Sequence, residues 1–231
     1  MTWEDYRSYV FDISKTNGQP FIKWTETAKL DAFLLRRLHS FCAETKCIRR
    51  DKVAFTIDSD SDGRFDLRDT TVFALPMCDI SQVVLNSNTL LGRDGLGEYS
   101  LDEIERSVQN YRTASEGTPS RWCIVPPTTL LLVPAPSAVL SNCYVSGWAL
   151  QPEPASESEE MLLAPEDTDA AAYDAAFALI YPQANGESME KAMNLRQMAE
   201  AEKAQVTARH ARRLHGGKPR RSSRITRHTL T

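Results

Sequence analysis

The acidic residues between positions 58 and 69 have the spacing of a calcium-binding loop. In the stretch FTIDSDSDGRFDLRD, the residues at EF-hand positions one, three, five, six, nine and twelve are Asp58, Asp60, Asp62, Gly63, Asp66 and Asp69. Carboxylate oxygens at these positions surround Ca²⁺ in EF-hands. An EF-hand also needs a helix on each side, whereas KVAFTI before the loop and TTVFALP after it have strand-like patterns. We therefore interpret the stretch as a polar hairpin turn, with a weak calcium site of another kind as the alternative.

A second stretch, GRDGLG at residues 92–97, has the glycine content of a phosphate-binding loop. A P-loop continues with Lys and then Ser or Thr after its last glycine, but Glu98 and Tyr99 follow here. We expect a flexible connection rather than a nucleotide site, and no cofactor is predicted.

The residue types that catalysis needs are sparse in this chain. His39 is the only histidine before residue 210, and no G-x-S-x-G or H-E-x-x-H motif occurs. The five cysteines are scattered without a C-x-x-C pair, which favours reduced, buried thiols over a disulfide framework or a zinc site. The sequence therefore predicts a protein that is not an enzyme and binds no metal at a cysteine site.

The charges are divided unevenly along the chain. All 31 acidic residues precede Lys203, whereas nine of the 27 basic residues lie from Lys203 onward. We call residues 215–231 the basic arm. The candidate partner-binding residues at this end of the chain are Arg209, Arg212, Arg213, Lys218, Arg220, Arg221, Arg224, Ile225 and Arg227. Such a segment has three possible roles: neutralising phosphates of a nucleic acid, docking into an acidic cleft of a partner protein, or simple solvation.

The helices that must position these residues are predicted from hydrophobic spacing. Residues 2–14 suit a short helix capped by Thr2, and a longer helix follows from Thr25 to about residue 46. The apolar stripe of this second helix consists of Leu30, Phe33, Leu34, Leu38, Phe41 and Cys42.

Beyond residue 50 the apolar pattern changes from the helical period to alternation. This alternation predicts strands over residues 53–57, 65–67, 72–75 and 80–86. A capping box at Ser100 and Glu103 predicts a short helix. RWCIVPPTTLLLVPAP predicts two strands joined by Pro126-Pro127, and SNCYVSGWAL predicts one more strand.

The last third of the chain is predicted to return to helix. Helices are expected over residues 166–181 and from about 188 to 214. The predicted fold class is α+β, in which N- and C-terminal helices form a bundle, a β-rich lobe is inserted, and the basic C-terminal tail is disordered or extended. The predicted units are bundle helices 1–50, a β-rich lobe 51–150, an acidic linker 151–165, bundle helices 166–214 and the basic tail 215–231.

Membrane insertion and secretion are not expected from the sequence. The longest apolar run, TTLLLV at residues 128–133, is too short to span a bilayer. The N-terminus carries acidic residues where a secretory signal carries basic ones, so we expect a cytosolic product.

Several segments together resemble the head-to-tail adaptor proteins of tailed bacteriophages, the tail-tubular-protein-A type of podovirus connector. FIKWTETAKLDAFLLRRLHSFCAETKC is similar to the early helix of that family, and RFDLRDTTVFALPMCDISQVVLNSNTLL to the segment that leads into its central lobe. RWCIVPPTTLLLVPAPS is similar to its L-x-L-x-P-x-P strand and is the most specific segment. PEDTDAAAYDAAFALIYPQAN with the charged helix after it resembles the C-terminal helix pair. The resemblance spans about residues 20–213, and the Asp-rich turn and the five cysteines have no role in the family.

The resemblance implies a structural virion protein that is not an enzyme. It would form a ring, typically of twelve copies, between the portal and the tail nozzle, and would extend the DNA channel for genome retention and ejection. Its implied partners are the portal protein, the tail nozzle or tail tubular protein, tail fibres, other copies of itself, and double-stranded DNA that passes through without sequence-specific binding. The C-terminal segments of the family commonly reach the portal, so residues 209–231 are predicted to dock in portal clefts and to order on assembly. The protein would be made in the host cytoplasm and reside in the virion neck.

Two other interpretations remain open at the level of sequence. The basic arm could belong to a nucleic-acid-binding module, although the body lacks a basic face with interleaved aromatic residues. The Asp-rich turn could belong to a calcium-dependent binding lobe, whose stability would then respond to a chelator.

Overall fold

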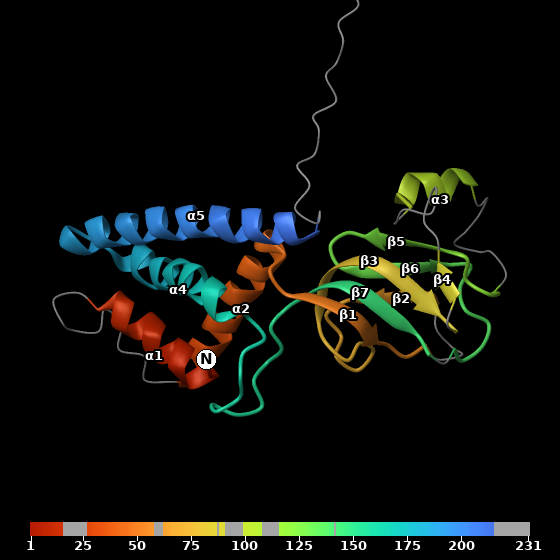
Figure 1. The fold of residues 1–231 in the computed structure, drawn as a ribbon, viewed down its shortest axis with the longest axis horizontal. Helices are drawn as coiled ribbons and strands as arrows, with labels where there is room; N and C mark the ends of the chain where they lie inside the picture. Colours follow the sequence, from red (N-terminus) through yellow and green to blue (C-terminus); the bar gives the residue numbers. More distant parts are fainter. Residues whose placement is uncertain are drawn as a thin grey trace, which may run out of the picture.

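A helical bundle and a β lobe lie side by side in the protein (Figure 1). The computed structural model describes residues 1–15, 27–57, 62–86, 88–90, 99–107, 116–140 and 142–214. The helices of the bundle come from the two ends of the described chain, and the strands come from its middle. This arrangement confirms the predicted α+β class with an inserted β-rich lobe. The basic arm lies outside the described residues.

The bundle is built around one alanine-rich helix. Its helices are α1 (Trp3–Ser14), α2 (Thr27–Thr45), α4 (Pro165–Ile180) and α5 (Glu187–Leu214), with the short 3₁₀ helix η2 (Tyr181–Gln183) between the last two. Helix α4 packs against α1, α2 and α5. Its small side chains at Ala171, Ala172, Ala175 and Ala176 are buried, so three neighbouring helices can approach it closely.

The predicted helix signals are confirmed in the first half of the bundle. Thr2 caps α1 in a capping box, in which its side chain accepts from the Asp5 N–H and the Asp5 carboxylate accepts from the Thr2 N–H. The apolar stripe of α2 is buried at Leu30, Leu34, Leu38, Phe41 and Cys42. Burial of this stripe against the other helices stabilises α2 more than its intrinsic propensity does.

The β lobe consists of two antiparallel sheets and one short helix. Its elements are β1 (Arg49–Ala54), β2 (Arg64–Asp66), β3 (Met77–Leu85), β4 (Asn88–Leu90), α3 (Leu101–Ser107), β5 (Arg121–Val125), β6 (Thr129–Val133) and β7 (Tyr144–Ala149). The strand orders are β1-β7-β3-β4 and β2-β6-β5. The turn at Pro126-Pro127 joins β5 to β6 as predicted. The capping box of α3 is also present, because Ser100 and Glu103 bond reciprocally at 3.0 and 3.2 Å.

The predicted strand at residues 72–75 is wrong. This segment is a turn in which only Phe73 forms an isolated bridge, to Phe55. The backbone carbonyl of Asp69 accepts from the N–H groups of Val72 and Phe73, which bends the chain before Pro76. Phe73 is nevertheless fully buried, because its ring stacks on Phe55 with the centroids 5.3 Å apart. Aromatic packing therefore produces the burial that the alternating pattern attributed to a strand.

The chain crosses between bundle and lobe twice, at neighbouring points. Ile48 leads out of the bundle and Ala149 leads back, and the Ala149 N–H donates to the Ile48 carbonyl over 2.8 Å. Near the return crossing, the His39 Nε2 of α2 lies 2.6 Å from the Gln151 carbonyl oxygen, and the Gln151 side chain accepts from the Leu162 N–H at 2.7 Å. Buried residues of both halves belong to one continuous hydrophobic core, so the junction is packed rather than open.

Candidate functional site

The basic end of α5 carries the first of the predicted partner-binding residues. Arg209 lies in the last turns of α5, and the backbone of Arg212 and Arg213 continues the helix. The side chains of Arg212 and Arg213 fall outside the described residues. So do all the remaining predicted partner-binding residues, namely Lys218, Arg220, Arg221, Arg224, Ile225 and Arg227. Partner docking by this set stays a prediction.

Arg209 and His210 hold the end of α5 against the first turn of α4. His210 Nε2 lies 2.7 Å from Asp167 Oδ2, and the Arg209 guanidinium lies 3.2 Å from Asp167 Oδ1. The Asp167 side chain is fully buried. The Arg209 contact is an ion pair without hydrogen-bond geometry, because Asp167 Oδ1 has no hydrogen-bond partner among the described residues. Arg209 instead donates to the Glu166 carbonyl oxygen at 3.3 and 3.4 Å. We call this arrangement the Asp167 clasp.

The Asp167 clasp fixes where the basic arm leaves the body of the protein. An acid in the first turn of a helix is stabilised by the helix dipole, and Asp167 meets a basic helix end there. The sequence prediction missed Asp167 and His210, because the clasp joins residues 43 positions apart. The one available signal was a Glu-Asp pair at the start of an alanine-rich helix.

A second group of ion pairs joins α5 to α2 and α4. The Lys203 ammonium donates to Glu44 at 2.6 Å, and the Arg37 guanidinium donates to Asp174 at 2.7 Å. The Lys203 hydrogen bond lowers the pKa of Glu44 below its ordinary value. Lys203 also lies 3.9 Å from Asp174, so this one residue of α5 pairs with acidic residues of both α2 and α4.

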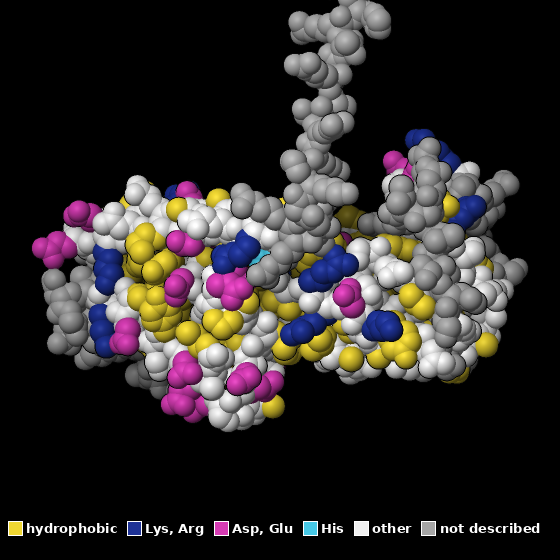
Figure 2. Space-filling view, in the orientation of Figure 1, with side chains coloured by type: hydrophobic (Ala, Val, Ile, Leu, Met, Phe, Trp, Pro, Cys, Tyr) yellow, Lys and Arg dark blue, Asp and Glu magenta, His cyan; other side chains and the backbone are white. Residues whose placement is uncertain are grey.

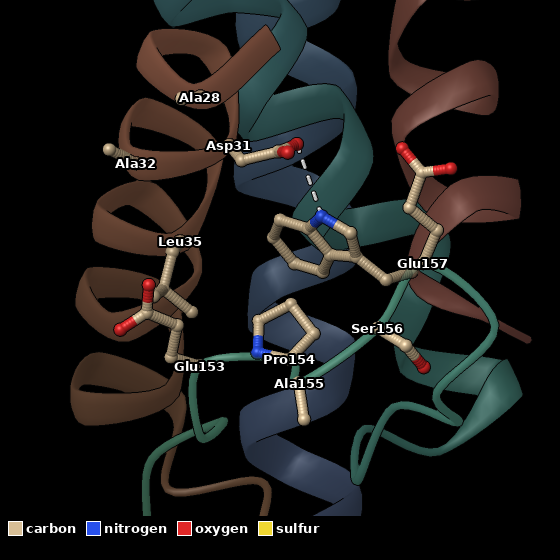
Figure 3. A pocket seen from close by; sticks show the side chains of 10 residues that line it. Ala28, Asp31, Ala32, Leu35, Glu153, Pro154, Ala155, Ser156 and Glu157 are labelled. Atoms are coloured by element: carbon tan, nitrogen blue, oxygen red, sulfur yellow. Dashed lines mark hydrogen bonds between the residues drawn. The ribbon is translucent and has the colours of Figure 1, made fainter.

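A groove opens on the other side of the bundle, between α2 and residues 153–157 (Figure 3). Its volume is about 320 Å³. The lining residues are Trp3, Ala28, Asp31, Ala32, Leu35, Glu153, Pro154, Ala155, Ser156 and Glu157. Most of these side chains are small or apolar, and Figure 3 shows Asp31 and Leu35 of α2 on the side of the helix that faces Pro154. We call this feature the α2 groove.

Polar contacts hold the walls of the α2 groove together. The Trp3 indole N–H donates to Asp31 at 3.1 Å, which is the dashed line in Figure 3. Arg7 joins both walls, because its guanidinium lies 3.3 Å from Asp31 and 2.7 Å from Glu157. The groove is therefore a built feature, in which a buried tryptophan and a shared arginine fix the spacing between helix and loop.

The surroundings of the α2 groove are acidic. The backbone of residues 157–160 runs beside the start of α1, because the Trp3 and Glu4 N–H groups donate to the Glu159 and Glu157 carbonyls at 3.0 Å. Acidic side chains gather at the lower edge of the bundle in Figure 2, where Figure 1 shows the connection into α4. The acidic residues at or beside the groove are Glu4, Asp5, Asp31, Glu153, Glu157, Glu159 and Glu160.

A strip of aromatic and methionine side chains lies along α4, η2 and the neighbouring part of α5. Tyr173, Phe177 and Tyr181 follow one another at four-residue spacing along the single outward face of that helix and η2. Hydrophobic side chains gather in this region in Figure 2, between α1 and α5. On the α5 side, the Arg196 guanidinium lies over the Phe177 ring at 6.0 Å, and Met193 is 40% exposed one turn earlier. Exposed aromatic, Met and Arg side chains are the residue types enriched in protein–protein contacts.

The polar groups that sequence reasoning examined for catalysis are engaged in structural contacts. Burial lowers the pKa of His39, whose ring meets a backbone carbonyl. Burial also raises the pKa of Cys78 to about 11, which disfavours the reactive thiolate. The Cys42 and Cys47 sulfurs lie 3.9 Å apart as free thiols. Within the described ranges, no three His, Cys, Asp or Glu side chains are grouped as metal ligands would be.

The described part of the Asp-rich stretch forms successive Asx turns. Asp62 accepts from the Arg64 N–H at 2.9 Å, and Asp66 accepts from the Arg68 N–H at 3.0 Å. Asp58, Asp60 and the glycine-rich loop at 92–97 lie outside the described residues, so calcium binding there stays an open alternative. No helix in the described part of the chain is both long enough and apolar enough to cross a bilayer.

Comparison with known proteins identifies one family. The model of the SU10 adaptor protein family matches residues 6–226. A search of curated proteins finds no match. The family match extends over the helical bundle, the β lobe and most of the basic arm, and it agrees with the resemblance stated from sequence. The chain therefore belongs to the SU10 adaptor protein family, a family of structural head-to-tail adaptors of bacteriophages.

Proposed function

We propose that this protein forms a ring between the portal and the tail nozzle and extends the DNA channel for genome retention and ejection. The observation that carries the proposal is the family match over residues 6–226. In the assembled virion the protein would contact the portal protein above, further copies of itself at its sides, and nozzle or fibre proteins below. Its site of action would be the virion neck, after synthesis in the host cytoplasm, and it would act without catalysis.

The distribution of surfaces supports a role in assembly. The Asp167 clasp fixes the root of the basic arm at one end of α5, whereas the aromatic strip of α4 faces outward between α1 and α5. The β lobe supplies a further surface beyond the junction (Figure 1). A structural adaptor needs such separate contact surfaces, because each copy must bind several partners at the same time.

The charge of the body fits a channel along which DNA must slide. All 31 acidic residues precede Lys203, so the body carries the negative charge of the protein. A basic channel lining would bind phosphates by releasing counterions and would slow the passage of the genome. Acidic residues facing the lumen would instead keep contacts with the passing duplex weak.

We further propose that the arm docks in acidic clefts of the portal through the predicted partner-binding residues. The test compares the full chain with a variant in which Lys218, Arg220, Arg221, Arg224 and Arg227 are all replaced by Gln. Sedimentation with purified portal rings should show at least a tenfold loss of affinity, because each charge-assisted contact is removed. The matched control replaces the four arginines by lysine, which keeps the net charge of the arm.

Two outcomes would contradict this docking. If the Gln variant binds portal rings as tightly as the unmodified chain, the arm is not the portal contact. If the unmodified chain ignores portal rings and binds duplex DNA with an affinity that falls steeply with salt, the nucleic-acid-binding interpretation replaces the adaptor contact.

A further inference from the structure

We infer that the α2 groove is a binding site for the basic arm of the same chain, which enters it with an arginine or lysine side chain. The groove is defined by its side-chain geometry. The arm is characterised by its charge and by the position of the end of α5, from which it begins. The inference does not depend on the proposed function, because it concerns the free protein whether or not portal is the final partner of the arm.

The size of the groove suits a single long side chain. Its volume of about 320 Å³ is at the lower end of the roughly 300–1,000 Å³ found for ligand pockets. Ala28, Ala32 and Ala155 leave the space open, because their side chains end at Cβ. Pro154 and Leu35 provide apolar walls along which the methylene groups of an arginine or lysine can lie while the charged head stays at the rim.

The charge at the rim selects a cationic occupant. Glu153 lines the groove, is exposed, and has no hydrogen bond or ion pair with any described residue. The acidic residues at or beside the groove outnumber the basic ones that flank it, which are Arg7, Lys29 and Arg36. A guanidinium or ammonium entering beside Glu153 would therefore gain an ion pair without displacing an existing one.

Arg7 is an example of a guanidinium that is bound by carboxylates of both groove walls. Its side chain lies between Asp31 and Glu157 and contacts the carboxylates of both walls. These contacts raise the pKa of Arg7 above its usual value, and the hydrogen bond to Glu157 contributes most. Arg7 is not among the residues that line the groove, whereas Glu153 lines it and is exposed, so its carboxylate is available to a second guanidinium.

The basic arm begins close enough to reach the groove. The Asp167 clasp places Arg209, five residues before the end of α5, against Glu166. Glu166 lies nine positions after Glu157 of the groove wall, so the two residues are at most about 30 Å apart even if the chain between them is fully extended. The 17 residues of the arm extend to about 56 Å, which covers this distance from the end of α5.

The arm is also the most cationic segment of the chain. It carries Lys218, Arg220, Arg221, Arg224 and Arg227, and it has no acidic residue. Because the arm is tethered to α5, its effective concentration at the groove is in the millimolar range. A weak ion pair that would not hold a free peptide is therefore sufficient to hold the arm.

The test is photo-crosslinking of the full chain in the absence of portal. Ser158, an exposed residue next to Glu157 of the groove wall, is replaced by the photoreactive residue p-benzoylphenylalanine, so that the probe does not fill the groove itself. Val139, which is 64% exposed on the β lobe, is replaced in the same way as a control. We expect the probe at position 158 to form a product of monomer mass in which residue 158 is joined to the 215–231 segment. We expect no such product from Val139.

Charge reversal at the rim then tests the chemistry. In the crosslinking background, Glu153→Lys should reduce the 158-to-arm product at least fivefold, whereas Glu116→Lys on the β lobe should leave it unchanged. Both variants should keep the thermal unfolding midpoint of the parent, since both positions are exposed. If Glu153→Lys shifts the unfolding midpoint, Glu153→Gln serves as the second variant, because it removes the charge alone. It should still lower the yield of the crosslinked product.

Three results would overturn the inference. One is the absence of any crosslink from residue 158 to the arm. Another is a product of dimer mass only, which would assign the groove to a neighbouring copy. The last is an unchanged yield in both Glu153 variants. None of these results bears on portal sedimentation, so the inference and the proposed function fail separately.

Discussion

At the scale of single residues, Asp167 decides how the end of α5 is held. Its carboxylate is fully buried and is contacted by Arg209 and His210. Replacing Asp167 by Asn would leave both basic side chains with a weaker partner. We expect a loss of about 1–3 kcal/mol in the free energy of unfolding, measured by urea denaturation, because buried polar groups lose their partners.

The matched control for Asp167→Asn is Asp12→Asn. Asp12 pairs with Lys15 at 2.6 Å, but its side chain is 65% exposed. Exposed ion pairs contribute about 0–1 kcal/mol, so this variant should unfold close to the parent. Equal losses in the two variants would mean that the Asp167 clasp is no stronger than a surface pair.

His39 gives the protein a pH dependence of known direction. Burial lowers its pKa below the ordinary value of 6.5. As the pH falls below 6.5, the unfolded chain therefore binds a proton that the folded protein resists, and stability falls until the folded-state pKa is reached. The contribution is fully present above the unfolded pKa.

The measurement compares urea midpoints at pH 7.5 and pH 5.5 for the parent and for His39→Gln. The parent should lose more stability on acidification than the variant, since glutamine keeps a donor for the Gln151 carbonyl but does not titrate. The other described histidine, His210, is present in both proteins, so it does not contribute to the difference between them. Identical pH slopes would show that His39 titrates alike in both states.

The sequence could identify which single residues carry charge, but not which of them meet. The basic residues after Lys203 were evident from composition, and Arg209 was among the predicted partner-binding residues. Its contacts with Asp167 and Glu166 depend on α5 folding back along α4. No local pattern encodes that distance, so the clasp emerged only from the structure.

At the scale of elements, β7 requires a glycine at position 147, where the backbone of the paired strand β3 lies very close to it. A Cβ on Gly147 would lie 2.2 Å from the Asp79 carbonyl oxygen and 2.8 Å from the Ile80 Cα. The β3–β7 register is irregular on both sides of this point, which brings the β3 backbone over Gly147. Gly147→Ala should therefore cost about 1–3 kcal/mol or more through overpacking.

Gly117→Ala, outside β7, is the control for Gly147→Ala, and the measurement is the thermal unfolding midpoint of each variant. Its added Cβ would lie 3.3 Å from the Pro134 Cγ, a side-chain atom that can shift slightly. We expect a small change for Gly117→Ala and a clearly lower midpoint for Gly147→Ala. A Gly147 variant that melts with the parent would mean that β3 can move away without loss.

Helices were better predicted than strands, for a physical reason. Helix signals are local: the apolar stripe of α2 and the capping boxes at Thr2 and Ser100 each lie within a few turns of chain. Strands depend on partners far away, and residues 72–75 had an apolar pattern without a strand to pair with along their length. The α2 groove was beyond sequence reasoning, because α2 and residues 153–157 form it together.

At the scale of the whole molecule, the continuous core couples the two halves. Leu34 of α2 is fully buried in a cluster that also contains Phe55 and Val145 of the lobe. Leu34→Ala should cost about 2–5 kcal/mol through cavity formation. Because the core is shared, amide hydrogen exchange should accelerate in β7 as well as in α4.

The control for Leu34→Ala is Ala32→Gly, an exposed position on the same helix, which should cost only about 1 kcal/mol. Faster exchange confined to α4 in the Leu34 variant would show that bundle and lobe unfold independently. That result would favour separate units, as the predicted boundaries at residues 50 and 150 suggest, over one cooperative body.

The insertion of the lobe between α2 and α4 also sets the order of events on the ribosome. The stripe of α2, from Leu30 to Phe41, emerges long before α4, against which α2 packs. At the usual rate of about 5–20 residues per second, Asp174 is added roughly 7–27 seconds after Phe41. The lobe is completed in that interval, and the bundle closes last. A nascent chain that stops before α4 would keep the apolar stripe of α2 exposed to solvent. The bundle can therefore fold only after the C-terminal helices have been translated.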